Sequence, residues 1–163
     1  GEGVVRIQTP DLARLDLFLA DGSSAGYAIL VGNALDLPGG DLAQRVLPPA
    51  PILWAALGVL RLPGTSDTTV HVRGDTTDAD LTARARADLP QMPQWRARFV
   101  GDQITDLWRS DARRLVESVH REPSSSGLWA IRYVQERTRM RLHITVTDTL
   151  TVESFDESIW RRP

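Results

Sequence analysis

The sequence predicts an α+β fold in which a mostly antiparallel sheet packs against one long amphipathic helix, at about residues 102–120, and two or three shorter helices. Two patterns support this prediction. Apolar residues recur at helical spacing between residues 102 and 120, and the following segment alternates polar and apolar residues as half-buried strands do. The length of 163 residues, of which 42% are hydrophobic and 25% charged, predicts a single globular domain over residues 1–163.

Short strands separated by turns are expected in the first third of the chain. Residues 4–7 and 15–19 have strand character, and Asp21-Gly22 is typical of a hairpin turn leading into a third strand at residues 25–31. A helix over residues 11–20 is the alternative for the second strand. Asp41 suits the N-cap of a short helix that ends before Pro48.

The middle of the chain contains one ambiguous segment and two clearer ones. Residues 52–60 are apolar nearly throughout, which fits either a buried helix or a buried strand. Residues 68–73 are rich in β-branched side chains and alternate, so they predict a strand. Asp78 is expected to cap a helix over residues 79–88.

The long helix and a hairpin complete the expected fold. On the helix, the residues at helical spacing are Ile104, Leu107, Trp108, Ala112, Leu115, Val116 and Val119. Strands at residues 128–135 and 139–147 follow, and the second alternates an apolar face with a polar one. A third strand at residues 150–155 and a terminal turn around Ile159 end the chain.

The composition excludes several kinds of chemistry. The chain has no cysteine, so disulfides, cysteine-bound metal clusters and thiol catalysis are impossible. All 19 basic residues are arginine, which excludes a P-loop lysine and a Schiff-base lysine. This bias is typical of a GC-rich bacterial genome. No cofactor or metal site is predicted, since the three histidines have no short ligand spacing.

Charge and hydropathy bear on partners and location. The net charge of −2 argues against a protein that coats nucleic acid, although residues 81–163 carry 14 arginines against 11 acids. No apolar run has the length of a membrane span, so no membrane partner is expected and a cytoplasmic location is the default. The start at Gly1-Glu2-Gly3 suggests an excised domain or a processed product.

Two histidine-containing strands suggest a possible enzyme site. His143 and Thr145 share one face of a predicted strand, and His71 and Arg73 do so on another. These segments resemble the paired half-motifs of the 2H phosphoesterase family, with Arg73 where the family has a hydroxyl residue. The resemblance implies that His71 and His143 act as acid and base while Thr145 and Arg73 bind the phosphate. The competing interpretation is that both histidines are ordinary strand residues.

Exposed arginines and tryptophans suggest a binding surface instead. Arg137, Arg139 and Arg141 form a basic stripe on the predicted C-terminal hairpin. Trp95 and Trp160 lie beside arginines in irregular segments, as interface anchors often do.

The function expected from the sequence is therefore a non-enzymatic protein-interaction or accessory domain that binds a protein partner or itself. A phosphoesterase-like enzyme acting on a phosphodiester or cyclic phosphate is the first alternative, so catalytic activity stays open. Binding of RNA or single-stranded nucleic acid through the arginine-rich hairpin, with Tyr133 as a stacking ring, is the second.

Overall fold

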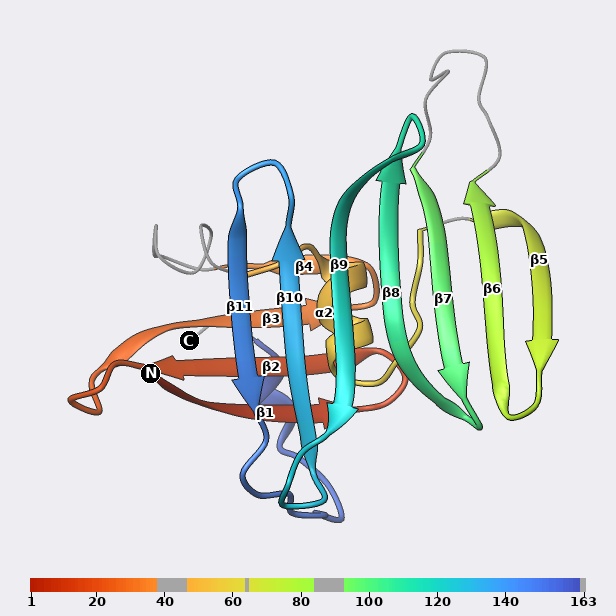
Figure 1. The fold of residues 1–163 in the computed structure, drawn as a ribbon. Helices are drawn as coiled ribbons and strands as arrows, with labels where there is room; N and C mark the ends of the chain where they lie inside the picture. The colour runs from red at the N-terminus through yellow and green to blue at the C-terminus, as the bar shows by residue number, and fades with distance from the viewer. Residues whose placement is uncertain (38–46, 64, 84–92, 162–163) are drawn as a thin grey trace. The chain divides into compact units, whose positions relative to one another are not determined.

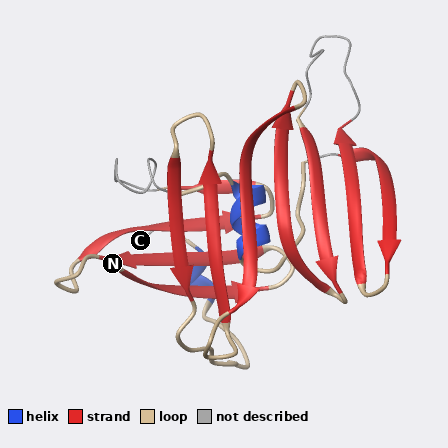
Figure 2. Ribbon diagram, in the orientation of Figure 1, coloured by secondary structure: helices blue, strands red, loops and turns tan. Residues whose placement is uncertain are grey.

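The computed structural model describes residues 1–37, 47–63, 65–83 and 93–161, which form two compact units. Unit 1 comprises Gly1–Ala50 and Leu150–Pro163, and unit 2 comprises Pro51–Thr149. Unit 1 contains a four-stranded sheet and unit 2 a seven-stranded sheet, both antiparallel (Figures 1 and 2). The expectation of a single domain over residues 1–163 stays a prediction.

The predicted α+β class is wrong, because the fold is mostly antiparallel β. Within the described residues there is one α-helix, α2 (Ala50–Ala56), and one 3-10 helix, η1 (Glu157–Trp160). Neither helix has the length and apolarity needed to cross a membrane. The ambiguous segment at residues 52–60 thus begins as a helix, which ends near Gly58. The helix expected from Asp41 lies outside the described residues.

Unit 1 is a meander in the order β1-β2-β3-β4. Its strands are β1 (Glu2–Gln8), β2 (Leu12–Phe18), β3 (Ser24–Val31) and β4 (Ala34–Asp36). The predicted turn at Asp21-Gly22 is confirmed: Gly22 has a φ of +81°, and the Ser23 N–H donates to the Asp21 carboxylate at 2.9 Å. The alternative helix over residues 11–20 is not formed. No strand is present at residues 150–155, whereas η1 confirms the terminal turn.

Arg14 connects η1 to the small sheet. Its Nη1 donates to the Ile159 carbonyl at 2.9 Å, its Nε donates to Asp16 at 2.9 Å, and its guanidinium lies 4.7 Å from the centre of the Tyr27 ring. Arg6 also pairs with Asp16. One arginine therefore holds the end of the chain to β2 by contacts that are local to unit 1.

The large sheet of unit 2 is a meander of seven strands in the order β11-β10-β9-β8-β7-β6-β5 (Figure 1). Their bounds are β5 (Thr65–Arg73), β6 (Thr76–Ala83), β7 (Gln94–Val100), β8 (Gln103–Asp111), β9 (Arg114–Pro123), β10 (Trp129–Gln135) and β11 (Met140–Thr145). Helix α2 contributes Ile52, Ala55 and Ala56 to the hydrophobic core on one face of this sheet. The sheet's buried contributions include Leu81, Trp95, Ala97, Ile104, Leu107, Val119, Ile131 and Tyr133.

The amphipathic helix expected at residues 102–120 is instead the β8–β9 hairpin. The register shifts between Arg98 and Phe99, so Phe99 pairs with Ile104 while Arg98 pairs with Asp106. This bulge at Thr105 buries both Ile104 and Leu107, three residues apart, which is a helical spacing. The turn also lacks the usual asparagine or glycine, so the hairpin signal was missing from the sequence.

That turn consists of Ala112 and Arg113, with Asp111 opposite Arg114. Both turn residues have positive φ, +48° and +68°, as a type I′ turn requires. A residue with a Cβ is strained in this conformation, and asparagine tolerates it better than alanine.

We therefore expect Ala112→Asn to raise the free energy of unfolding by about 0.5–1 kcal/mol, because asparagine adopts the left-handed conformation more readily. The measurement is the urea unfolding midpoint of the variant against the parent chain. Thr138→Asn, in the β10–β11 turn but without a positive φ, is the control and should not stabilise. Equal effects of the two substitutions would contradict the backbone explanation.

Asp78 is likewise not a helix cap. Asp78 and residues 79–83 belong to β6, and the remainder of the expected helix lies outside the described residues. In contrast, the predicted strand at residues 68–73 and the C-terminal hairpin are confirmed as β5, β10 and β11. The pairing of Leu142 with Tyr133 and of His143 with Arg132 also confirms the expected alternation of apolar and polar faces.

Two polar groups are buried on the core side of the large sheet. The first is Glu117, whose Oε1 accepts a hydrogen bond from the Tyr133 hydroxyl at 2.9 Å and whose Oε2 lies 3.1 Å from Arg109 Nη1. Gln135 donates to the same Oε1 at 3.3 Å. Burial first, and then the Glu117 charge, raises the pKa of the Tyr133 hydroxyl, so this group stays a donor.

The second buried group is Arg121, which is 5% exposed and donates to the Ile104 carbonyl at 2.8 Å. Its guanidinium stacks 4.1 Å from the Trp129 ring centre and lies against Gly58, where the chain leaves α2. Burial lowers its pKa. A Cβ at position 58 would lie 2.9 Å from Arg121 Nη1, and Gly58 has a φ of +90°, so both space and backbone require glycine there.

Candidate binding face of the seven-stranded sheet

The face of the large sheet opposite its core is densely charged. One row of directly paired residues crosses all seven strands, and we call it the charged row. From β11 to β5 its members are His143, Arg132, His120, Asp106, Arg98, Asp78 and His71. Residues directly opposite each other in antiparallel strands project to the same side, so these side chains share one face.

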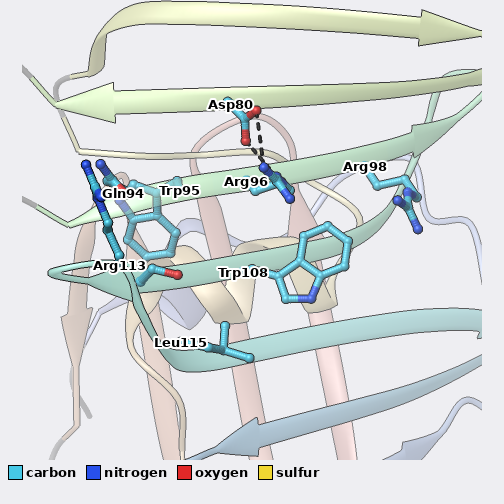
Figure 3. Close-up of a pocket in the computed structure, with 9 residues that line it drawn as sticks. Asp80, Gln94, Trp95, Arg96, Arg98, Trp108, Arg113 and Leu115 are labelled. Carbon is cyan, nitrogen blue, oxygen red and sulfur yellow. Dashed lines mark hydrogen bonds and ion pairs between the residues drawn. The ribbon is translucent and has the colours of Figure 1, made fainter.

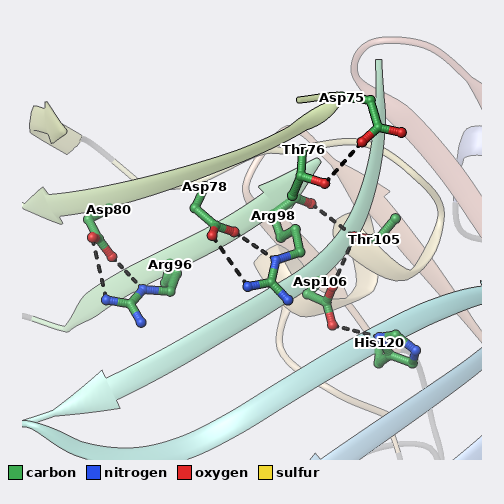
Figure 4. A network of polar contacts seen from close by, with 9 residues as sticks. All are labelled: Asp75, Thr76, Asp78, Asp80, Arg96, Arg98, Thr105, Asp106 and His120. Carbon is green, nitrogen blue, oxygen red and sulfur yellow. Dashed lines mark hydrogen bonds and ion pairs between the residues drawn. The ribbon is translucent and has the colours of Figure 1, made fainter. Parts of the chain in front are cut away.

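Ion pairs connect neighbouring members of this face (Figure 4). Arg98 binds Asp78 through two donors, with Nε at 2.7 Å and Nη2 at 3.3 Å from the carboxylate oxygens. Arg96 binds Asp80 in the same way, at 2.6 and 3.4 Å. Two-donor contacts fix the plane of a guanidinium as well as its position. Both arginines are therefore held in defined orientations on a solvent-facing surface.

His120 and Asp106 occupy the centre of the charged row. His120 Nδ1 lies 2.6 Å from Asp106 Oδ1, and the Thr105 hydroxyl donates to Asp106 Oδ2 at 2.9 Å. The other ring nitrogen of His120, Nε2, lies 3.5 Å from Glu122 Oε2. Among the described residues, no hydroxyl is hydrogen-bonded to either ring nitrogen, so the pair holds a histidine in place but presents no activated nucleophile.

The hydrogen bond from Arg98 lowers the pKa of Asp78 below its ordinary value of 3.8. Such a carboxyl binds fewer protons in the folded state, so its contribution to stability is present above the unfolded pKa and is lost as the pH falls through the folded pKa. We therefore expect the parent chain to be more stable than Asp78→Asn at pH 6 and to lose this advantage as the pH falls below 3.8 and through the lowered pKa of the folded state. The urea unfolding midpoints of the two chains at pH 6 and at pH 2 measure this advantage.

Asp102→Asn is the matched control for this pH experiment, because Asp102 lies in a turn and has no ion pair with another described residue. The difference in urea unfolding midpoint between Asp102→Asn and the parent chain should change little between pH 6 and pH 2. An advantage of the parent chain over Asp78→Asn that persisted at pH 2 would contradict the assignment to the Asp78 carboxylate.

A shallow pocket of about 380 Å³ opens beside the charged row (Figure 3). Its apolar surface comes from Trp108 and Leu115, and its polar lining includes Arg96, Arg98 and Arg113. The Arg98 guanidinium lies 5.4 Å from the centre of the Trp108 ring. Leu115 is 38% exposed, so the pocket presents apolar surface on an otherwise charged face.

Arginines also gather at one end of the same sheet, where the β8–β9 and β10–β11 hairpins turn. The Glu136 N–H donates to the Val116 carbonyl at 2.9 Å, which joins the two hairpins at this end. The exposed arginines there are Arg113, Arg114, Arg137, Arg139 and Arg141, and we call this group the basic end. None of the five has an ion pair with another described residue. Their charges are therefore available to an anionic partner.

The histidines of the phosphoesterase-like hypothesis are far apart. His71 lies on β5 and His143 on β11, the two edge strands. Six strand spacings separate them, about 29 Å along the sheet at the usual strand distance. Arg73 accompanies His71 on β5, and Thr145 accompanies His143 on β11. The structure therefore does not bring the four proposed catalytic residues together.

The predicted partner-binding residues have three different locations. Arg137 and Arg139 lie in the β10–β11 turn and Arg141 on β11, so these three come together at the basic end. Trp95 is 4% exposed and belongs to the hydrophobic core, although it borders the pocket. Trp160 lies in η1 of unit 1, where it packs edge-on against Phe155 with 5.5 Å between the two ring centres.

The paired charges of β6 and β7 were missed from the sequence, although a signal for them exists. Asp78-Ala79-Asp80 and Arg96-Ala97-Arg98 have opposite charges at the same spacing of two, with a small residue between them. On adjacent antiparallel strands this pattern places each acid opposite an arginine. Because Asp78 also fits a helix cap, the sequence alone does not show that these two segments pair. Trp108 was assigned to a helix core and was therefore also missed.

Comparison of the chain with protein-family models, with curated proteins and with solved structures finds no match.

Proposed function

We propose that this chain is a non-enzymatic binding domain that recognises an acidic protein surface through the basic end of its seven-stranded sheet. The observation that carries the proposal is the convergence of five exposed arginines from two hairpins. Among the described residues of these two hairpin turns, the exposed acids are Asp111, which lies 3.6 Å from Arg109, and Glu136. Arginine is favoured at protein interfaces because its planar fork binds carboxylates through two donors.

Two observations favour a protein partner over nucleic acid. Tyr133, the ring suggested for base stacking, is 2% exposed and hydrogen-bonded to Glu117, so its face is not available. The net charge of the chain is −2, whereas nucleic-acid-binding domains are usually strongly basic. A local group of arginines in a nearly neutral chain suits a local acidic patch on another protein.

The test is binding of a fluorescein-labelled hexaglutamate peptide, measured by fluorescence anisotropy at several salt concentrations. We expect Arg137→Gln/Arg139→Gln and Arg113→Gln/Arg114→Gln each to weaken binding about tenfold at low salt, equivalent to about 1.4 kcal/mol. The effect should shrink at high salt because surface charges are then screened.

Arg161→Gln is the matched control, because Arg161 is an exposed arginine of unit 1 paired with Glu157. It should change binding less than about twofold. A labelled oligouridylate is tested alongside the peptide. If the RNA bound more tightly and lost affinity in the same variants, the basic end would be a nucleic-acid site and the proposal would fail. Binding of neither probe, or an equal loss in the control, would also overturn it.

A further inference from the structure

We infer that the pocket beside Trp108 receives an aromatic side chain of the acidic partner, with a neighbouring carboxylate of that partner bound to Arg113. This inference rests on the proposed function, since it names the residue type that anchors the partner. It assigns separate roles to the pocket and to the remaining arginines of the basic end.

The pocket is suited to a flat apolar group. Trp108 is half-buried, and Leu115 exposes 38% of its surface on a face whose other side chains are mainly charged. Apolar surface surrounded by polar groups is typical of the anchor pockets of protein interfaces. A volume of about 380 Å³ is sufficient for one aromatic side chain.

Arg96 and Arg98 provide preorganised walls. Each is fixed by two donors to a carboxylate, Arg96 to Asp80 and Arg98 to Asp78. Their charges are compensated, so they have little left to offer a carboxylate. A guanidinium still stacks well on an aromatic ring, and a side chain that is already fixed loses little entropy when a ligand binds.

Arg113 differs from both in having no ion pair with another described residue. It lines the pocket and also belongs to the basic end, so the pocket adjoins the surface that attracts the acidic partner. An aromatic residue next to an acid would fill the apolar floor, stack on the guanidinium groups and neutralise Arg113. An acid alone would leave Trp108 and Leu115 uncovered, and a leucine would gain less from the guanidinium faces.

The experiment compares three labelled peptides that differ only at one central position: hexaglutamate, and hexaglutamate with that glutamate replaced by phenylalanine or by leucine. We expect the phenylalanine peptide to bind the parent chain about fivefold more tightly than either of the others. Trp108→Leu should reduce this preference to less than about twofold. Leu115→Ser, at an exposed position that tolerates a polar residue, gives a second variant should Trp108→Leu fail to fold.

Arg137→Gln is the control for the pocket, because Arg137 belongs to the basic end but does not line the pocket. It should weaken all three peptides equally and leave the preference for phenylalanine intact. Equal binding of the three peptides by the parent chain, or equal binding of the leucine and phenylalanine peptides, would overturn the aromatic anchor. Arginine-dependent binding of hexaglutamate would still support the proposed function in either case, whereas loss of all salt-sensitive binding would overturn both.

Discussion

Replacing Trp95 by alanine is expected to lower the free energy of unfolding by about 3–5 kcal/mol. The indole is 4% exposed and packs in the core of the large sheet. Alanine would leave a cavity, because close-packed neighbours relax only partly into the space. Equilibrium urea unfolding, followed by far-UV circular dichroism, measures the loss.

Trp95→Phe is the matched control. The Trp95 Nε1 has no hydrogen-bond partner among the described residues, so the substitution by phenylalanine removes no hydrogen bond. We expect it to cost less than half as much as alanine, since most of the buried apolar area is kept. If alanine cost less than about 1 kcal/mol, Trp95 would be a surface residue, as the sequence suggested.

Glu117→Ala should be comparably destabilising, by about 3–5 kcal/mol, because it removes one partner of a buried ion pair. The side chain of Glu117 is 3% exposed and that of Arg109 is 27% exposed. The substitution also leaves the buried Tyr133 hydroxyl without its acceptor. Chemical denaturation at neutral pH is again the measurement.

A double-mutant cycle separates the ion pair from simple packing. Glu117→Ala/Arg109→Met removes both charges, so the double variant should be more stable than Glu117→Ala alone. Tyr133→Phe, which removes only the hydroxyl, should cost about 1–2 kcal/mol. If the costs of Glu117→Ala and Arg109→Met simply added in the double variant, the two side chains would not be coupled and the assigned pair would be absent.

The parts of the fold that the sequence predicts well are those with strict alternation and a conventional turn. The hairpin at Asp21-Gly22 contains the residues that its geometry needs. In β11, Met140 and Leu142 alternate with Arg141 and His143, and the strand register follows that alternation. In both cases the local sequence agrees with the final structure.

The β8–β9 hairpin fails for the opposite reason. Its bulge at Thr105 spaces Ile104 and Leu107 as a helix would, and its turn uses Ala112 and Arg113 at positive φ. Glu117 and Arg121 are buried where an amphipathic pattern assigns them to the surface. Their partners Arg109, Tyr133 and Trp129 lie on neighbouring strands, so only the tertiary fold explains their burial.

For the candidate site, the sequence identified single side chains but not their arrangement. The exposed arginines at 137, 139 and 141 were found, because a charged turn is visible locally. Arg113 and Trp108 join them only through pairing of strands that the helix prediction removed. The proposed histidine pair shows the converse problem, since similar short motifs on β5 and β11 say nothing about their separation.

The charged row also has a consequence for the open edges of the large sheet. Each edge strand carries one of its histidines, His71 on β5 and His143 on β11, and Arg141 stands beside His143. An unpaired edge is a template on which another molecule can add a strand and begin a growing aggregate. Two β11 strands meeting antiparallel would bring the Arg141 guanidinium groups of the two chains into each other's neighbourhood, and this contact between like charges disfavours the pairing. The Arg141 charge at the β11 edge thus opposes uncontrolled polymerisation of the chain through this strand.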